Sequence, residues 1–329
     1  MQYQAPWWLP GGHAQTIWSA KVAQSHRPQT APRWQRERWI TPDNDFIDID
    51  YSLDAVDDQA PLVVMFHGLE GNRDSHYVKA MATVAQQRGW AFALVHFRGC
   101  SGEINLRPRA YHSGDHEEID WVLKRFAQQH PLRSRRAVGV SLGGNALMRW
   151  AGEYGSSATT VVDSIVSVCS PLDLMASGHA IGRGFNRWVY TPRFLKTMKP
   201  KAVQKWQQYP GLFDLEAVLS AKDLFEFDNA FTAPLHGFKD TLDYWTRAAA
   251  KPVMRNIRIP ALAINARNDP FVPAVSLPQV RDVSTDVTLW QPAQGGHVGF
   301  ARSSQGWGVP GDVRALPEAV AHWWEQVHG

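Results

Sequence analysis

The chain has 329 residues, of which 44% are hydrophobic and 20% are charged, and its formal net charge is +3 at pH 7. This length suits one large domain, and the basic residues fall in short runs interrupted by apolar ones, which argues against a nucleic-acid partner. The two cysteines, Cys100 and Cys169, exclude a disulfide framework and show no metal-ligand spacing. With no apolar run of about 18 residues and no signal-peptide pattern, we expect a cytoplasmic protein without a bound metal.

In chain order, residues 1–30 are rich in proline, glycine and histidine without periodicity, so we expect an irregular arm. Beyond the arm, apolar runs typical of strands alternate with amphipathic helical segments. The predicted strands are 36–40, 46–53, 61–66, 90–95, 136–140, 161–168, 260–265 and 287–290. The predicted helices are 77–88, 117–129, one that follows Ser141 and ends near residue 154, and 316–327. This order predicts the α/β class, with a mostly parallel sheet of about eight strands, helices on both faces and an antiparallel hairpin at one edge.

The alternation breaks between residues 171 and 252. This segment has helical periodicity, many aromatic side chains and no good strand. We expect it to form a helical cap inserted over the carboxyl ends of the strands, inside a single domain that spans residues 1–329.

One turn carries a chemical signal, because residues 139–143 read Gly-Val-Ser-Leu-Gly between a predicted strand and a predicted helix. Small residues on both sides of Ser141 let the two backbones pass close together, and the tight turn exposes the serine hydroxyl at the edge of the sheet. The backbone N–H of Leu142 then lies at a helix N-terminus, where it can stabilise an oxyanion. The N–H of Leu69, just after the strand 61–66, is the predicted second donor. An ordinary Gly-Ser turn has the same pattern, so the other strand ends decide between the two interpretations.

Two further groups follow predicted strands, where ligands and catalytic groups gather in open α/β sheets. Asp269 lies in the loop after the strand 260–265, and His297 lies between glycines after the last strand. A neutral imidazole can take the proton of a serine hydroxyl, and a carboxylate holds that imidazole in the required tautomer. The order Ser141, Asp269, His297 therefore predicts a nucleophile, its orienting acid and its base. Asp173, just after the strand 161–168, is the alternative acid.

At these motifs the chain resembles the α/β-hydrolase fold family, and within it the branch of the bacterial YheT-type esterases and the related eukaryotic lipases and acyltransferases. The stretches that carry the resemblance are Pro10–Ile17, His67–Asn72, Phe97–Gly102, Tyr111–Gly114, Gly139–Asn145, Asn268–Phe271 and Gly295–Phe300. The resemblance implies an esterase-like hydrolase with a Ser141–Asp269–His297 charge relay and with neither a metal nor an organic cofactor. Beside these groups, we expect Gly68, Glu70 and Val298 to contact the substrate.

One motif of some relatives is missing. The acyltransferase pattern H-x-x-x-x-D is absent, because Asp120 follows His116 at the wrong spacing. Acyl transfer to a second acceptor is therefore not the expected main activity.

The apolar side chains of residues 171–250 give a clue to the chemical class of the substrate. If they line the inner face of a cap they would receive an acyl group, although they could equally serve to anchor the cap. We predict a carboxylesterase-type serine hydrolase that acts through an acyl-enzyme on small-molecule esters with short- to medium-chain acyl groups. The alternatives are an acyltransferase or lipase with the same three residues, or a catalytically silent binding scaffold.

Peripheral membrane contact stays open, because four lysines lie beside apolar residues of the cap, namely Lys196, Lys199, Lys201 and Lys205 beside Leu195, Met198 and Trp206.

The Trp7-Trp8 pair is too apolar for a free tail. We therefore expect the N-terminal arm to pack near the mouth of the site.

Overall fold

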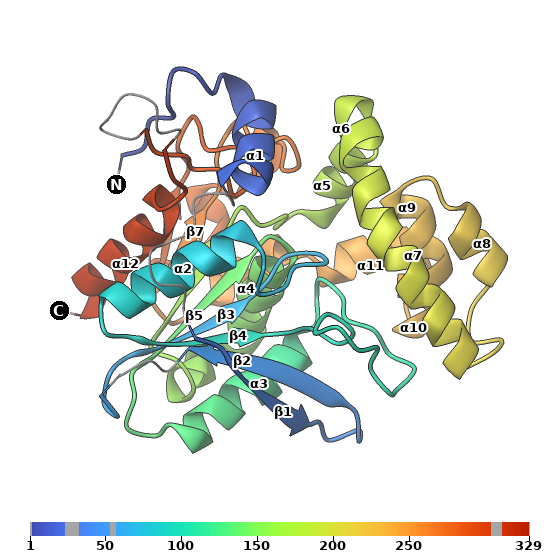
Figure 1. Cartoon of the computed structure of the whole chain (residues 1–329), viewed down its shortest axis with the longest axis horizontal. Helices are drawn as coiled ribbons and strands as arrows, with labels where there is room; N and C mark the ends of the chain where they lie inside the picture. The colour runs from blue at the N-terminus through green and yellow to red at the C-terminus, as the bar shows by residue number, and fades with distance from the viewer. Residues whose placement is uncertain (1, 24–32, 53–56, 304–310, 329) are drawn as a thin grey trace.

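In the computed structural model, which describes residues 2–23, 33–52, 57–303 and 311–328, an eight-stranded sheet runs through the centre of the molecule (Figure 1). Its strands are β1 (Gln35–Ile40), β2 (Phe46–Ser52), β3 (Leu62–Phe66), β4 (Ala91–Val95), β5 (Arg135–Val140), β6 (Ser164–Val168), β7 (Ala261–Ile264) and β8 (Val287–Trp290). Their order in the sheet is β1-β2-β4-β3-β5-β6-β7-β8. The β1–β2 and β2–β4 pairs are antiparallel, and every other pair is parallel. The predicted fold class is thus confirmed; Leu53, the last residue of one predicted strand, lies outside the described residues.

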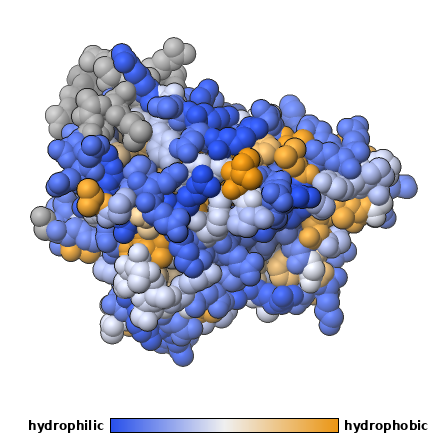
Figure 2. All heavy atoms as spheres, turned by 90° about the horizontal axis from the view of Figure 1, so that it is seen from below, coloured by the Kyte–Doolittle hydropathy of each residue, from blue (hydrophilic) through white to orange (hydrophobic). Residues whose placement is uncertain are grey.

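Helices cover both faces of this sheet. Every residue of β3, β4 and β6 is buried, as expected for parallel strands with a helical layer on each side. The layers consist of α2 (His76–Gln87), α3 (His116–Gln129), α4 (Leu142–Tyr154) and α12 (Ala315–His328). The helices α3 and α4 contribute to the core on one face, which includes Trp39 and Phe126, and α2 and α12 contribute to the core on the other, which includes Trp90 and Trp324. One face of the molecule, seen in Figure 2, is mostly hydrophilic, with hydrophobic residues in small separate patches.

The chain between β6 and β7 is helical and lies to one side of the sheet in Figure 1. It comprises α5 (Leu174–Ile181), α6 (Gly184–Val189), α7 (Thr191–Gln208), α8 (Leu215–Ser220), α9 (Leu224–Phe227), the π-helix η3 (Asp228–Thr232), α10 (Ala233–Leu235), α11 (Thr241–Ala248) and the 3-10 helix η4 (Lys251–Asn256). Further 3-10 turns are η2 (Gly155–Thr160), η5 (Ala274–Ser276) and η6 (Val280–Asp282). A separate apolar cluster within this segment, which includes Leu195, Phe213 and Phe227, packs the helices against one another. These helices occupy the segment predicted to be an inserted cap.

The prediction of an irregular arm at residues 1–30 is wrong for its central part, which forms α1 (Gly11–Lys21). The residues that α1 buries include Gln15, Thr16 and Ser19. Because this helix buries polar side chains that are hydrogen-bonded to loops, it lacks the apolar stripe by which a sequence pattern reveals a helix. Residues 24–30 of the predicted arm lie outside the described residues.

The two tryptophans of the arm have different surroundings. Trp7 is 91% exposed, whereas Trp8 packs edge-on against Trp18 of α1, with ring centroids 5.1 Å apart.

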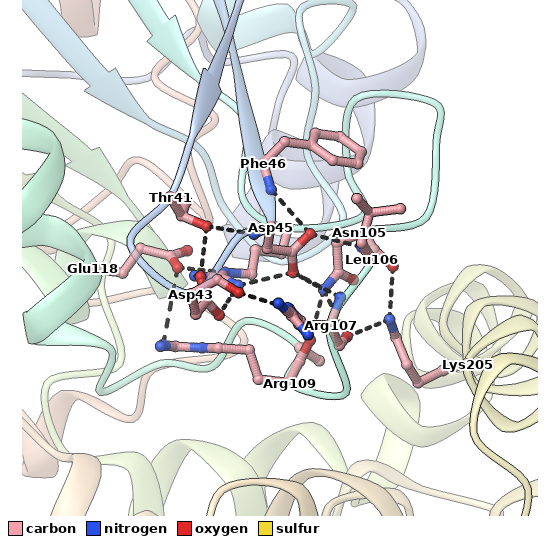
Figure 3. A network of polar contacts seen from close by, with 12 residues as sticks. Thr41, Asp43, Asp45, Phe46, Asn105, Leu106, Arg107, Arg109, Glu118 and Lys205 are labelled. Atoms are coloured by element: carbon pink, nitrogen blue, oxygen red, sulfur yellow. Dashed lines mark hydrogen bonds and ion pairs between the residues drawn. The ribbon is translucent and has the colours of Figure 1, made fainter.

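A polar network joins the helical segment to the loops at the hairpin end of the sheet (Figure 3). The buried carboxylate of Asp45 accepts hydrogen bonds from the Asn105 side chain at 2.7 Å and from the backbone N–H of Leu106 at 2.6 Å. From α7, the ammonium group of Lys205 donates to the backbone oxygens of Asn105 at 2.8 Å and Arg107 at 2.6 Å. Lys205 of the helical segment and Asp45 beside the sheet therefore both hydrogen-bond to the same loop, residues 105–107.

We expect Lys205→Met to lower the free energy of unfolding by about 2–4 kcal/mol, because the buried carbonyl groups lose a charged donor. The Lys205 side chain is buried, whereas Lys196 on the same helix is exposed, so Lys196→Met is the matched control and should leave stability unchanged. Denaturant unfolding of both variants measures the difference. Equal midpoints for the two variants would show that the network adds nothing to stability.

Candidate active site

Ser141 occupies the turn between β5 and α4 in a strained conformation, with φ 51° and ψ −117°. For a residue with a Cβ, such a backbone costs about 1–3 kcal/mol and persists only where the surroundings enforce it. The close contacts of the neighbouring glycines show how the surroundings enforce this backbone conformation. A Cβ on Gly139 would lie 2.5 Å from the carbonyl oxygen of Gly143, and one on Gly144 would lie 2.0 Å from Oγ of Ser170. The strand and the helix therefore touch backbone to backbone, and the serine is pushed out at the end of the strand.

The structure brings Ser141, His297 and Asp269 together from three loops. Oγ of Ser141 lies 3.1 Å from Nε2 of His297, and Nδ1 of the same ring lies 2.8 Å from Oδ2 of Asp269. The other carboxylate oxygen, Oδ1, accepts hydrogen bonds from the backbone N–H groups of Phe271 at 2.8 Å and Val272 at 3.3 Å. Because a carboxylate only accepts, Nδ1 carries the proton, and Nε2 is left free to accept the serine proton.

The alternative acid, Asp173, has a different place. Its side chain accepts a hydrogen bond from the backbone N–H of Ala176 at 3.0 Å and caps the N-terminus of α5. It therefore serves the helix that follows β6, and Asp269 is the acid that contacts His297.

The helix α1 holds the two loops that carry Asp269 and His297. Oγ1 of Thr16 accepts the backbone N–H of His297 at 2.8 Å. The side-chain oxygen of Gln15 accepts the N–H of Gly295 at 2.9 Å and the side-chain amide of Asn268 at 3.0 Å. A helix from the N-terminus thus fixes the relative position of loops from the C-terminal half of the chain.

The sequence analysis expected the N-terminal arm, which includes these two side chains, to pack near the mouth of the site, but it gave Gln15 and Thr16 no role there; in the structure they bond to the loops that carry Asp269 and His297. A signal was available, because Gln15 and Thr16 lie in one of the stretches that carry the family resemblance, in a segment without apolar periodicity. A polar segment of that kind, when it is buried, must satisfy its groups against specific partners.

We expect Thr16→Val to lower kcat/KM about fivefold with little change in KM, because losing one hydrogen bond of about 1 kcal/mol loosens the loop that orients His297. Thr16→Ser keeps the hydroxyl group and should restore most of the activity. Steady-state kinetics on a soluble ester measures both variants. If Thr16→Ser were as impaired as Thr16→Val, the effect would come from packing and not from the hydrogen bond.

The two predicted oxyanion donors border the same space as the serine. Leu69, Leu142, Ser141 and His297 all line a cavity of about 110 Å³. Within the described part of the chain, the backbone N–H groups of Leu69 and Leu142 have no hydrogen-bond partner. Two unpartnered donors beside a serine hydroxyl are the arrangement that a tetrahedral oxyanion requires.

The loop that carries Leu69 is held by the buried His67. Its Nδ1 lies 2.7 Å from the oxygen of Gly68, and its Nε2 accepts the backbone N–H of Phe97 at 3.1 Å. Burial lowers the pKa of His67 to about 3, so the ring is neutral and its Nδ1 carries the proton that it donates.

The three residues predicted to contact substrate lie around this cavity and not in its wall. The backbone N–H of Gly68 donates to the hydroxyl of Tyr77 at 3.0 Å. The Glu70 carboxylate pairs with the ammonium group of Lys201 at 2.8 Å. The Val298 side chain is buried in the core on the α2–α12 face.

The cavity wall is mostly apolar and comes largely from the helical segment. It includes Leu174, Ile181, Phe194, Met198 and Trp245, which belong to α5, α7 and α11. A wider opening of about 530 Å³, lined by Arg109, His112 and other polar residues, includes neither Ser141 nor His297.

Among residues 2–23, 33–52, 57–303 and 311–328, no group of three or more His, Cys, Asp or Glu side chains is placed to hold a metal ion. In the same ranges, no helix combines the length and the apolar character needed to cross a bilayer.

The parallel sheet, the strained serine turn and the loops at its strand ends define a hydrolase of the α/β class. The chain belongs to the alpha/beta hydrolase fold family, whose sequence profile matches residues 61–302. The resemblance found in the sequence motifs is thereby confirmed.

Among curated relatives, YheT of Escherichia coli (strain K12), whose name assigns it provisionally to the esterases, is 38% identical over 272 residues, which cover 82% of this chain and 78% of YheT. The mouse protein named phospholipase ABHD3 is 29% identical over 252 residues, which cover 76% of this chain. The chain spans 60% of the length of that phospholipase.

Solved structures share the fold at low sequence identity. The esterase Pf2001 of Pyrococcus furiosus has a TM-score of 0.52 at 16% identity, with 90% of each chain covered. A bacterial membrane phospholipase A has a TM-score of 0.56 at 14% identity, with 90% of this chain and 87% of the other covered.

Proposed function

We propose that this hydrolase cleaves carboxylic esters through an acyl-enzyme on Ser141. The observation that carries the proposal is the continuous chain of polar contacts from Ser141 through His297 to Asp269, beside two unpartnered backbone N–H groups. A silent binding scaffold would have no need to keep a serine in a strained conformation with an imidazole 3.1 Å from its hydroxyl oxygen.

In the proposed reaction, Oγ of Ser141 attacks the ester carbonyl carbon while Nε2 of His297 takes the hydroxyl proton. The carbonyl oxygen becomes an oxyanion that accepts hydrogen bonds from the N–H groups of Leu69 and Leu142. The C–O bond to the alcohol then breaks, and the imidazolium returns its proton to the leaving oxygen. Water, deprotonated by the same imidazole, attacks the acyl-enzyme and releases the carboxylic acid with the serine restored.

Cavity chemistry supports an apolar acyl group of modest size. The wall formed by residues such as Ile181, Phe194 and Met198 offers apolar contact, and the volume is only about 110 Å³. The relatives named as esterases or phospholipases are consistent with an acyl ester as substrate. We therefore propose short- to medium-chain acyl esters as the substrate class.

Labelling with a fluorophosphonate tests the mechanism, and p-nitrophenyl esters of increasing chain length test the substrate class. We expect the wild-type chain to be labelled and His297→Ala to escape labelling, because the serine then lacks its base. We expect kcat/KM to rise from acetate to a medium-length acyl group and then fall. A wild-type chain that neither labels nor cleaves any of the esters would contradict the proposal.

A further inference from the structure

The short helix α6 presents two aromatic side chains to solvent within a stretch of chain that is rich in exposed basic residues. Phe185 is 50% exposed and Trp188 is 79% exposed. Four exposed basic residues lie near them in the chain, one just before α6, one on α6 and two in the first turns of α7. We call this set the α6 surface, and it consists of Arg183, Phe185, Arg187, Trp188, Arg193 and Lys196.

Positive charge on this surface is not compensated by neighbouring acids. The sequence has no aspartate or glutamate between Asp173 and Asp214. None of the four basic side chains forms an ion pair with any residue that the structure describes. Asp223, which lies beside Gly182, uses its carboxylate to cap α9. The surface therefore offers unpaired cations to an anionic partner.

The two aromatic rings are exposed in a fixed position, because hydrogen bonds anchor α6 to α5 and to a neighbouring loop. The side-chain amide of Asn186 donates to the carbonyl oxygens of Ala180 at 3.0 Å and Pro270 at 2.6 Å. The rings of His13 and Phe185 lie 4.5 Å apart, so α1 supports the helix from the other side. Because α6 is anchored, a partner would meet a preformed surface and would not have to order it.

Of the four lysines from which the sequence suggested membrane contact, Lys196 is exposed and belongs to the α6 surface, whereas the other three are arranged differently. Lys201 is paired with Glu70, Lys205 is buried against backbone oxygens, and Lys199 donates to the carbonyl oxygens of Leu219 and Ala221. These three lysines bind other parts of the protein, so of the four only Lys196 is left free within the part of the chain that the structure describes. The free cations lie instead on α6 and the first turns of α7.

We propose that the α6 surface docks on a bilayer rich in anionic phospholipid, with Trp188 and Phe185 entering the interfacial region. Exposed aromatic side chains within a basic helical surface suit this partner, because the rings gain apolar contact while the cations stay at the level of the anionic headgroups. A polyanion without an apolar layer would satisfy the arginines and leave Trp188 in water.

The docking surface adjoins the wall of the cavity that contains Ser141. Ile181, at the end of α5, and Phe194, in the second turn of α7, both line that cavity, and α6 lies between them in the chain. Docking through α6 would therefore set this wall next to the lipid. Acyl esters could then reach Ser141 from the bilayer. That last inference rests on the proposed function, whereas the docking itself does not.

Flotation of the full-length chain with lipid vesicles tests the docking. We expect binding to vesicles of phosphatidylcholine with phosphatidylglycerol, weakening as salt is added, and little binding to phosphatidylcholine alone. Replacing Arg183, Arg187 and Arg193 by glutamine should weaken binding about fivefold per charge. Trp188→Ala should weaken it about tenfold or more, because the ring no longer buries apolar area.

Matched controls come from α3 and the loop after it, which lie on the opposite side of the sheet from α6 in Figure 1. Lys124→Gln removes an exposed positive charge that, unlike those of the α6 surface, is paired with an acid, Asp120, at 2.7 Å, and Leu132→Ala removes a side chain that is 76% exposed. Neither change should affect binding. Equal effects of α6 variants and controls, or no binding to anionic vesicles at low salt, would overturn the proposal. So would a wild-type dimer in light scattering that Trp188→Ala dissociates, because α6 would then contact a second copy of the chain.

Hydrolysis of p-nitrophenyl acetate by the same variants separates docking from catalysis. This soluble ester needs no bilayer, so we expect unchanged activity in every α6 variant, which also shows that each is folded. A wild-type chain that binds vesicles but does not cleave the ester would contradict the proposed function and still support the docking proposal.

Discussion

Ser141→Ala is expected to lower kcat for ester hydrolysis by about 10⁶-fold, which is the scale of losing the nucleophile from a serine–histidine–aspartate unit. The reason is geometric as well as chemical. No other hydroxyl oxygen is recorded within hydrogen-bonding distance of Nε2 of His297 among the described residues, so no neighbour can take over the attack. Any residual rate would come from the two N–H donors and from binding.

The control for this change is Ser156→Ala, which removes an exposed serine after α4 and should leave both kcat and fluorophosphonate labelling intact. Circular dichroism and thermal unfolding would check that Ser141→Ala is folded. Because alanine shares the unfavourable backbone conformation of Ser141, we expect no large change in stability. Activity of Ser141→Ala within tenfold of the wild type would refute the acyl-enzyme on this residue.

Asp269→Asn is expected to lower kcat by about 10⁴-fold. In the structure, Oδ1 of Asp269 accepts two backbone N–H groups and Oδ2 faces Nδ1 of His297. An asparagine would keep its amide oxygen on the backbone donors and turn its NH₂ group toward the imidazole. Nδ1 would then have to accept, Nε2 would carry the proton, and the ring could no longer act as the base.

Asp173→Asn is the matched control, because it makes the same chemical change at the other acid that the sequence allowed. Asparagine is as good an N-cap as aspartate, so we expect α5, stability and activity to be retained. Steady-state kinetics of both variants with a soluble ester, over a range of pH, gives the comparison. A loss at Asp173 that matched the loss at Asp269 would place the relay carboxylate elsewhere.

Much of the sheet was predictable because its signals are local. Strands buried on both faces must be continuous apolar runs, and β3, β4 and β6 are of this kind. In a parallel sheet the carboxyl ends of the strands meet at one edge, so residues just after β5, β7 and β8 were expected to lie close together. Ser141, Asp269 and His297 are those residues, and the structure places them in contact.

The helix α1 was not predictable in this way. Its buried side chains, among them Gln15 and Thr16, contact loops that lie about 250 to 280 residues further along the chain. Periodicity detects a helix through the apolar face that it buries, and this helix buries hydrogen bonds instead. The burial of Lys201 and Lys205 was not predictable for the same reason, because their partners, Glu70 and Asn105, lie about 100 or more residues earlier in the chain.

By itself, the sequence determined the class of the fold, the succession of strands and the residue types at their ends, because these depend on burial and backbone sterics that act over a few residues. Only the tertiary structure decided which acid meets His297, which lysines are buried and which face of the helical segment keeps its cations free. Those outcomes depend on partners far apart in the chain. A charged side chain is buried or left in water according to whether a carboxylate or a carbonyl group is there to receive it.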